Sequence, residues 1–238
     1  INRELSWLKF NDRVLQEAAD ESVPLIERFR FLGIFSNNLD EFFKVRYATV
    51  RRIDEAGRGG KSELGIKASE LLEIITNSVI KQQSASLDIL ANIGEKLENE
   101  GIFLVDETTI KKDHHDFIKN YFIQQISPAL VTIVLNDSLE LPVLKDISAY
   151  LAVKMKLKSG RKQYALIEIP KTMNRFIVLP SIRDKSYVMI LDDLLRYCLD
   201  DIFNIFNYES ITANMIKITR DGELDFDSDL SKSFIEKL

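Results

Sequence analysis

The hydrophobic pattern of this chain changes its period at Gly101. Before Gly101, apolar residues recur every three or four positions, which is typical of amphipathic helices. After it, helical segments mix with short β-branched or alternating segments, which are typical of strands. We therefore expect an α+β chain. An N-terminal antiparallel helical bundle should occupy residues 1–100, and an α+β head domain with a mainly antiparallel sheet should follow over residues 101–238.

The first region contains four helical patterns joined by short loops. Phe10 falls on the apolar face of the first pattern, and polar residues at 81–83 interrupt the fourth without changing its period. Gly101 closes the fourth pattern, as glycine commonly does at a helix C-terminus. The predicted helices run from Asn2 to Ala19, from Pro24 to Phe35, from Leu39 to Ile53 and from Leu64 to Leu97.

The second region alternates between the two periods. A hairpin is predicted where two alternating segments flank Ser159-Gly160, and the last segment, from Ser231, starts a helical pattern and stops. We therefore expect the head domain to be truncated at its C-terminus. Strands are predicted at 102–105, 129–135, 150–158, 163–169, 175–179, 187–190 and 213–219, and helices at 108–126 and 191–206. The strands at 175–179 and 187–190 are expected to extend the sheet of the hairpin.

Composition narrows the class of protein. Hydrophobic residues make up 45% and charged residues 29%, as in soluble globular proteins. No apolar run approaches the roughly 20 residues that span a bilayer, and we expect no signal peptide, since no charged-then-apolar leader appears. The single cysteine, Cys198, excludes an internal disulfide and indicates a reducing, cytoplasmic setting. A net charge of −5 argues against nucleic-acid binding.

The junction between the second and third predicted helices carries an excess of polar residues. Ser36, Asn37 and Asn38 are residue types that cap helix N-termini, and Asn38 with Glu41 has the spacing of a capping box. One cap would suffice, so the tandem asparagines leave a spare carboxamide. That group could read the edge of an adenine base. A doubled cap and a ligand contact both remain possible from the spacing.

Residues with catalytic chemistry are scarce. His114 and His115 are adjacent in a charged stretch, where a solvated helix surface is the expected role. Cys198 lies on the apolar face of a helix and is expected to be a small buried hydrophobe. Gly60-Lys61-Ser62 lacks the earlier glycine and the preceding strand of a phosphate-binding Walker loop, so we interpret it as a helix–helix loop. The sequence therefore predicts no catalytic and no metal-binding residue.

A basic group follows the asparagine junction. It comprises Lys44, Arg46, Arg51, Arg52 and Arg58, of which the first, third and fifth recur every seven residues. Guanidinium groups on one helix face could guide a polyanion. Equally, these cations could pair with nearby carboxylates and favour a helix C-terminus. The pattern does not decide between the two.

The junction belongs to a longer set of motifs that resembles the N-terminal part of the long, ATP-dependent polyphosphate kinases. The resemblance spans essentially the whole chain in register. It rests on residues 3–11, 14–20, 24–28 and 31–46 (FLGIFSNNLDEFFKVR), and on residues 164–170, 175–176, 191–203 and 217–221.

The resemblance implies a specific activity. Members of this family reversibly transfer the γ-phosphate of ATP to inorganic polyphosphate through a phosphohistidine and with Mg²⁺. The present chain resembles the N-terminal helical domain and most of the head domain, which contributes to homodimers, so it should be inactive alone. The phosphorylated histidine lies in C-terminal domains of the family, and neither histidine here matches it. The second asparagine of the family's Ser-Asn-Asn motif contacts adenine, which assigns that contact to Asn38 and leaves Asn37 as the expected cap.

The resemblance also implies partners and a location. ATP or ADP, inorganic polyphosphate and a second copy of the chain are the expected partners, in the cytoplasm or in peripheral association with a membrane. A non-enzymatic interaction or dimerisation module is the alternative, with Phe203, Phe206 and Tyr208 as possible interface residues, although core packing is the default for such aromatics.

Overall fold

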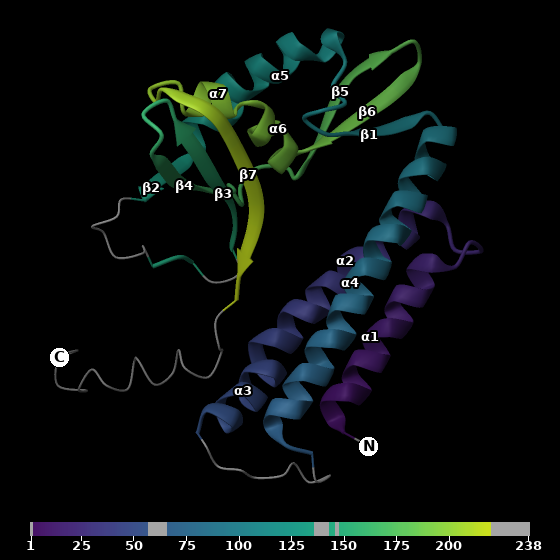
Figure 1. The fold of residues 1–238 in the computed structure, drawn as a ribbon. Helices are drawn as coiled ribbons and strands as arrows, with labels where there is room; N and C mark the ends of the chain where they lie inside the picture. Colours follow the sequence, from purple (N-terminus) through teal and green to yellow (C-terminus); the bar gives the residue numbers. More distant parts are fainter. Residues whose placement is uncertain (1, 57–65, 136–142, 146–147, 220–238) are drawn as a thin grey trace, which may run out of the picture. The chain divides into compact units, whose positions relative to one another are not determined.

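The computed structural model describes residues 2–56, 66–135, 143–145 and 148–219 (Figure 1). These residues form two compact units, one within residues 1–96 and one spanning residues 97–218. The first unit is helical and the second combines helices with sheets, so the predicted α+β class is confirmed. The Gly60-Lys61-Ser62 loop, Arg58 and the helix start predicted at Ser231 lie outside the described residues.

The first unit is built from long helices. Asn2 caps the first of them, since its Oδ1 accepts the N–H of Leu5 at 3.0 Å. The helices are Arg3–Ala19 (α1), Leu25–Glu41 (α2), Ala48–Glu55 (α3) and Ala68–Asn99 (α4), and a π-helical segment, Phe42–Tyr47, joins α2 to α3.

The helix boundary predicted at residues 36–38 is wrong. Helix α2 continues through it, and the N–H of Phe42 bonds to the carbonyls of Asn38 and Leu39. Asn37 and Asn38 are therefore interior helical residues and not caps. The reason is packing: Phe35, Leu39 and Phe42 form one buried stripe across the junction, so ending the helix would remove that stripe from the core.

Buried polar contacts set the register of the first unit. Arg28 Nε donates to the carbonyl of Ala18 at 2.8 Å, and its Nη2 donates to Asn92 Oδ1 at 3.1 Å. Gln82 Nε2 donates to the carbonyl of Leu8 at 3.0 Å. The middle of α4 thus lies near Leu8, and the later residues Asn92 of α4 and Ala18 of α1 share Arg28, so these helices run parallel, with α2 antiparallel to both. Their shared core comprises Leu8, Leu15, Phe35, Leu39, Phe42, Val50, Leu71, Ile75 and Val79.

One residue of the predicted apolar face lies outside this core. Phe10 is 58% exposed, because the face that α1 buries is defined by Leu8, Asn11, Leu15 and Ala18. A completely buried asparagine therefore stands where the helical period would place an apolar side chain.

The second unit contains an antiparallel four-stranded sheet of order β2-β4-β3-β7. Strands β3 and β4 form the predicted hairpin around Ser159-Gly160, where Gly160 takes φ +83°. Leu151, Val153 and Met155 are buried, whereas Lys154 and Lys156 are exposed. The strands are Val131–Leu135 (β2), Ser148–Leu157 (β3), Lys162–Glu168 (β4) and Tyr208–Ile218 (β7).

The strands predicted to extend this sheet instead form another one. Its order is β1-β6-β5, and the strands are Ile102–Val105 (β1), Phe176–Ile182 (β5) and Lys185–Ile190 (β6). β1 pairs with β6 in parallel, and β5 pairs with β6 antiparallel. Strand β1 pairs with one side of β6, although about 80 residues separate them in the sequence. Pairing between such distant segments leaves no local signal in the sequence.

The helices of the second unit are shorter than predicted. The segment predicted to start at Thr108 starts at Lys112, because Asp106 Oδ1 holds the N–H groups of Thr108 and Thr109 in a turn. The segment from Leu191 to Phe206 breaks at Cys198. The helical elements are Lys112–His114 (3₁₀), His115–Tyr121 (α5), Phe122–Ile126 (π), Ser127–Ala129 (3₁₀), Leu191–Tyr197 (α6) and Leu199–Ile202 (α7).

The aromatic residues considered for an interface pack in the core of the second unit. Phe203 is buried, and Phe206 and Tyr208 pack against the same cluster. The default of core packing is therefore confirmed for these residues. Over the described part of the chain, the helices are too short or too polar to cross a membrane.

Candidate functional site

A pair of asparagine side chains connects α1 to α2. Asn38 Nδ2 donates to Asn11 Oδ1 at 2.9 Å, and Asn11 Nδ2 donates to the carbonyl of Phe35 at 3.2 Å. Asn11 is completely buried, whereas Asn38 is only partly buried. The carboxamide of Asn38 is therefore held from within the bundle and reachable from outside.

An aromatic pair lies one helical turn away. The rings of Trp7 and Phe42 stack with centroids 4.9 Å apart and planes inclined by 28°. Trp7 precedes Asn11 by four residues on α1, and Phe42 follows Asn38 by four residues on the other helical run. Residues four apart on a helix are neighbours on its surface. The polar pair and the aromatic pair are therefore adjacent.

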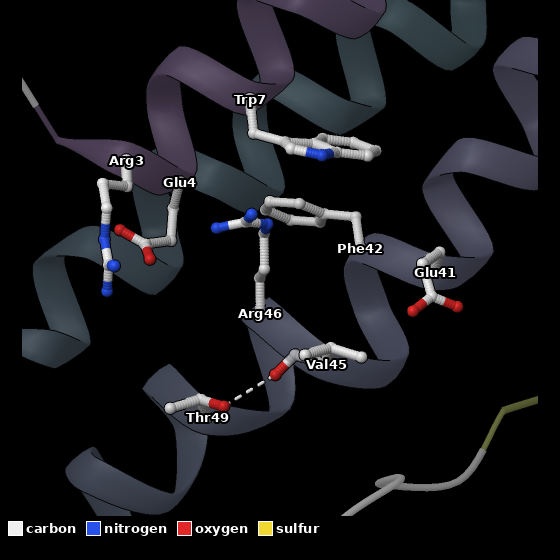
Figure 2. Close-up of a pocket in the computed structure, with 8 residues that line it drawn as sticks. All are labelled: Arg3, Glu4, Trp7, Glu41, Phe42, Val45, Arg46 and Thr49. Atoms are coloured by element: carbon white, nitrogen blue, oxygen red, sulfur yellow. Dashed lines mark hydrogen bonds between the residues drawn. The ribbon is translucent and has the colours of Figure 1, made fainter.

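The aromatic pair forms part of the wall of a pocket of about 340 Å³ between α1 and the π-helical segment (Figure 2). In Figure 2 the guanidinium of Arg46 lies beside the Phe42 ring, while Arg3 and Glu4 extend from the facing helix. The lining combines two guanidinium groups, two carboxylates and an aromatic surface, and the guanidinium groups and the ring suit a ligand that carries both negative charge and a flat ring. The lining residues are Arg3, Glu4, Trp7, Glu41, Phe42, Val45, Arg46 and Thr49.

The π-helical segment shapes this pocket. It carries Phe42, Val45 and Arg46. A π-turn bonds each residue to the fifth one along and so changes the direction of the side chains relative to a regular α-helix; such turns occur frequently at functional sites. The segment therefore aims Arg46 at the pocket while the helical run stays continuous.

The predicted basic group does not act as one row. Arg51 Nε pairs with Glu55 Oε1 at 2.8 Å, and Arg52 Nη2 donates to Thr49 Oγ1 at 3.1 Å. Arg46 alone among the described members of the group lines the pocket. Local pairing, the simpler of the two interpretations, therefore holds for Arg51.

A second hollow lies between α2 and α4. It has a volume of about 610 Å³ and a mostly apolar lining that includes Leu87, which is 66% exposed. Its polar residues are few, so it lacks the mixture of charge and aromatic surface found in the first pocket. The lining residues are Phe29, Leu32, Gly33, Phe35, Ser36, Leu39, Asp40, Phe43, Gln83, Ser86, Leu87 and Leu90.

The two histidines have different environments, and the solvated surface predicted for both is wrong for His114. That residue is completely buried, its Nε2 lies 3.0 Å from the carbonyl of Pro180, and its ring meets Tyr187 edge-on at 4.7 Å. His115 is exposed, as predicted. The 3₁₀ turn that ends at His114 rotates its ring inward onto β5. His114 is thus a packed structural residue.

Cys198 is buried as predicted, and burial raises the pKa of its thiol to about 12. The thiol therefore stays protonated and unreactive at neutral pH. No three His, Cys, Asp or Glu side chains gather in a metal-binding group within the described ranges.

Sequence reasoning singled out Asn38 but missed its surroundings. Asn11, Trp7 and Arg3 join Asn38 and Arg46 only because α1 packs against α2. One signal was available: Asn11 interrupts the apolar stripe formed by Leu8, Leu15 and Ala18. A polar residue at a core position often has a specific partner.

Known proteins similar to this chain all point to one family. A family model of the polyphosphate kinase N-terminal domain matches residues 1–105, and a model of the polyphosphate kinase middle domain matches residues 113–238. The polyphosphate kinase of Vibrio parahaemolyticus is 39% identical over 245 aligned positions, covering 100% of this chain and 34% of the relative. That of Escherichia coli K12 is 40% identical over 243 positions, covering 99% of this chain and 35% of the relative.

A solved structure agrees with the sequence relatives. The crystal structure of polyphosphate kinase from Porphyromonas gingivalis superposes with a TM-score of 0.81 at 30% identity, covering 94% of this chain and 33% of that one. The chain thus spans about a third of the length of the relatives that it matches. Both domain models, the relatives and the fold agree, and the chain belongs to the polyphosphate kinase family.

Proposed function

We propose that this chain provides the adenine-contacting part and the head domain of a cytoplasmic, ATP-dependent polyphosphate kinase. The reaction is the reversible transfer of the γ-phosphate of ATP to inorganic polyphosphate through a phosphohistidine, with Mg²⁺ neutralising the phosphates. The family resemblance supports this reaction. The burial of His114 and its contact with Pro180 argue against that residue as the phosphohistidine.

The residue that we assign to the nucleotide is Asn38. The observation that carries this assignment is the partly buried Asn38, whose carboxamide is held by Asn11 and which lies one helical turn before Phe42 of the stacked pair. A carboxamide can pair with the edge of adenine, and Trp7, the partly exposed member of the aromatic pair, can support the face of the base. The pocket that Trp7 and Phe42 line does not include Asn38 itself; it carries Arg3 and Arg46, which can bind phosphate oxygens, together with Glu4 and Glu41.

Replacement of Asn38 tests the assignment. In the full-length kinase, Asn38→Ala should raise KM for ATP by roughly tenfold, since a lost base contact costs about 1–3 kcal/mol. Asn37→Ala is the matched control, because Asn37 is the exposed neighbour on the same helix. It should leave KM unchanged. An unchanged KM in Asn38→Ala would remove the adenine contact from the proposal. The 238-residue chain by itself should synthesise no polyphosphate in the same assay.

Self-association belongs to the same proposal. In the second unit, Val178 on the edge strand β5 is 70% exposed and Ile205 is 84% exposed. Large exposed apolar side chains are common at subunit contacts. Light scattering of the full-length protein over a range of concentrations measures the association, and Val178→Lys should shift it toward the monomer.

A further inference from the structure

Asn11 occupies a position at which the fold calls for an apolar side chain. It lies on the buried face of α1, between Leu8 and Leu15, and is completely buried. Burying a carboxamide costs free energy unless its groups find partners. An aliphatic residue there would join the core that Leu8 and Leu15 already form. An apolar side chain would suffice for packing, so the specific consequence of the asparagine lies in the two partners of its carboxamide.

The contacts of Asn11 determine which way its carboxamide points. Its Nδ2 lies 3.2 Å from the carbonyl oxygen of Phe35. A main-chain carbonyl can only accept a hydrogen bond, so the nitrogen of Asn11 must face it. The oxygen of Asn11 must then face Asn38, at 2.9 Å from Asn38 Nδ2.

The contact with Asn11 also determines the orientation of the Asn38 carboxamide. Because Asn11 offers an acceptor, Asn38 must turn a donor toward it, and its own Oδ1 points away from Asn11. An isolated asparagine can exchange its oxygen and nitrogen by rotating about one bond. Here the backbone carbonyl of Phe35 determines the orientation of both carboxamides in turn.

We propose that Asn11 is a positioning residue for nucleobase selection, which holds the Asn38 oxygen outward as an acceptor. An adenine base presents an exocyclic amino group, which donates to such an acceptor, whereas guanine presents a carbonyl oxygen at the equivalent position. Two acceptors facing each other leave both unpaired. This inference rests on the proposed contact between Asn38 and the base, and it extends that contact to the preference for ATP over GTP.

The test compares kcat/KM for ATP with kcat/KM for GTP in the full-length kinase. Asn11→Leu keeps the size of the side chain and suits the core, but it offers Asn38 no acceptor. The ratio of the two constants should fall about tenfold relative to the wild type. Asn11→Asp retains an oxygen toward Asn38, so the ratio should stay near that of the wild type, although a buried carboxyl group destabilises the bundle.

A purely structural role predicts the opposite order, because Asn11→Asp would perturb the bundle more than Asn11→Leu. Gln82→Ala serves as the control for bundle stability, since Gln82 also bonds α1, at the carbonyl of Leu8. It should leave the ATP/GTP ratio unchanged. The double variant Asn11→Leu/Asn38→Ala should be no less selective than Asn38→Ala alone, because Asn11 acts through Asn38.

The outcomes separate this inference from the proposed function. A folded Asn11→Leu enzyme with wild-type selectivity, alongside a raised KM in Asn38→Ala, would overturn the role of Asn11 and leave the adenine contact intact. An unchanged KM in Asn38→Ala would overturn both. Equal use of ATP and GTP by the wild type would overturn the selectivity role alone.

Discussion

Arg28 shows how much one buried charged residue can contribute to this bundle. The residue is 2% exposed, and its guanidinium bonds to the carbonyl of Ala18 on α1 and to Asn92 on α4. Removing the side chain would leave buried acceptors on two helices without a donor. A surface arginine two residues later, Arg30, makes a 2.6 Å pair with Glu27 in solvent.

These two arginines allow a matched comparison. Arg28→Ala should lower the free energy of unfolding by about 2–4 kcal/mol, because buried hydrogen bonds are lost. Arg30→Ala should lower it by less than about 1 kcal/mol, because exposed ion pairs contribute little. Chemical denaturation followed by far-UV circular dichroism measures both. Equal losses would show that burial does not determine the contribution of Arg28.

At the scale of elements, two glycines of the same helical run have opposite roles. Gly94 lies within α4, and a Cβ added there would meet no atom within 4 Å. Gly101 follows the end of α4 with φ +79°, a conformation that favours glycine. Its N–H bonds to the carbonyl of Glu98, and its carbonyl accepts the N–H of Ser186 on β6. Gly101 thus ends the helix and places the start of β1.

Alanine should therefore change stability in opposite directions at these two positions. Gly94→Ala should raise the free energy of unfolding by about 0.5–1 kcal/mol, because alanine favours a helix. Gly101→Ala should lower it by about 1 kcal/mol or more, because the left-handed conformation strains an L-residue. Thermal unfolding of both variants under one condition tests the pair. A gain in stability for Gly101→Ala would contradict the assigned helix ending.

At the scale of the whole molecule, one buried carboxylate couples stability to pH. Asp193 is bonded to Arg196 Nη2 at 2.9 Å, yet burial raises the pKa of its carboxyl to about 6. The folded state therefore holds a proton on Asp193 at pH values at which the unfolded chain has lost it. This preference stabilises the folded state below the unfolded pKa and disappears as the pH rises through about 6.

The prediction concerns the difference between wild type and Asp193→Asn. As the pH rises from about 4 to about 6, the wild type should lose roughly 3 kcal/mol of unfolding free energy relative to the variant, with no further change above that range. The amide keeps an acceptor for Arg196. Denaturant titrations at a series of pH values measure the difference, with the exposed Asp113→Asn as control. A difference independent of pH would remove Asp193 as its source.

Much of the fold followed from local pattern. The period of apolar residues located α1, α4, the β3–β4 hairpin and the change near residue 101, because side-chain period depends on the local backbone. The Ser-Asn-Asn motif likewise directed attention to Asn38. These predictions needed only residues that lie close together in the sequence.

Packing between distant segments decided the rest. The stripe of Phe35, Leu39 and Phe42 kept α2 continuous where local capping residues predicted an end. The pairing of β1 with β6 divided the strands between two sheets, and contact with β5 buried His114. Asn11 and Asn38 form a hydrogen bond although they lie 27 residues apart in the sequence. Hydrogen bonds and burial between remote residues depend on the tertiary structure, so the orientation of the proposed adenine contact could not be determined from the sequence alone.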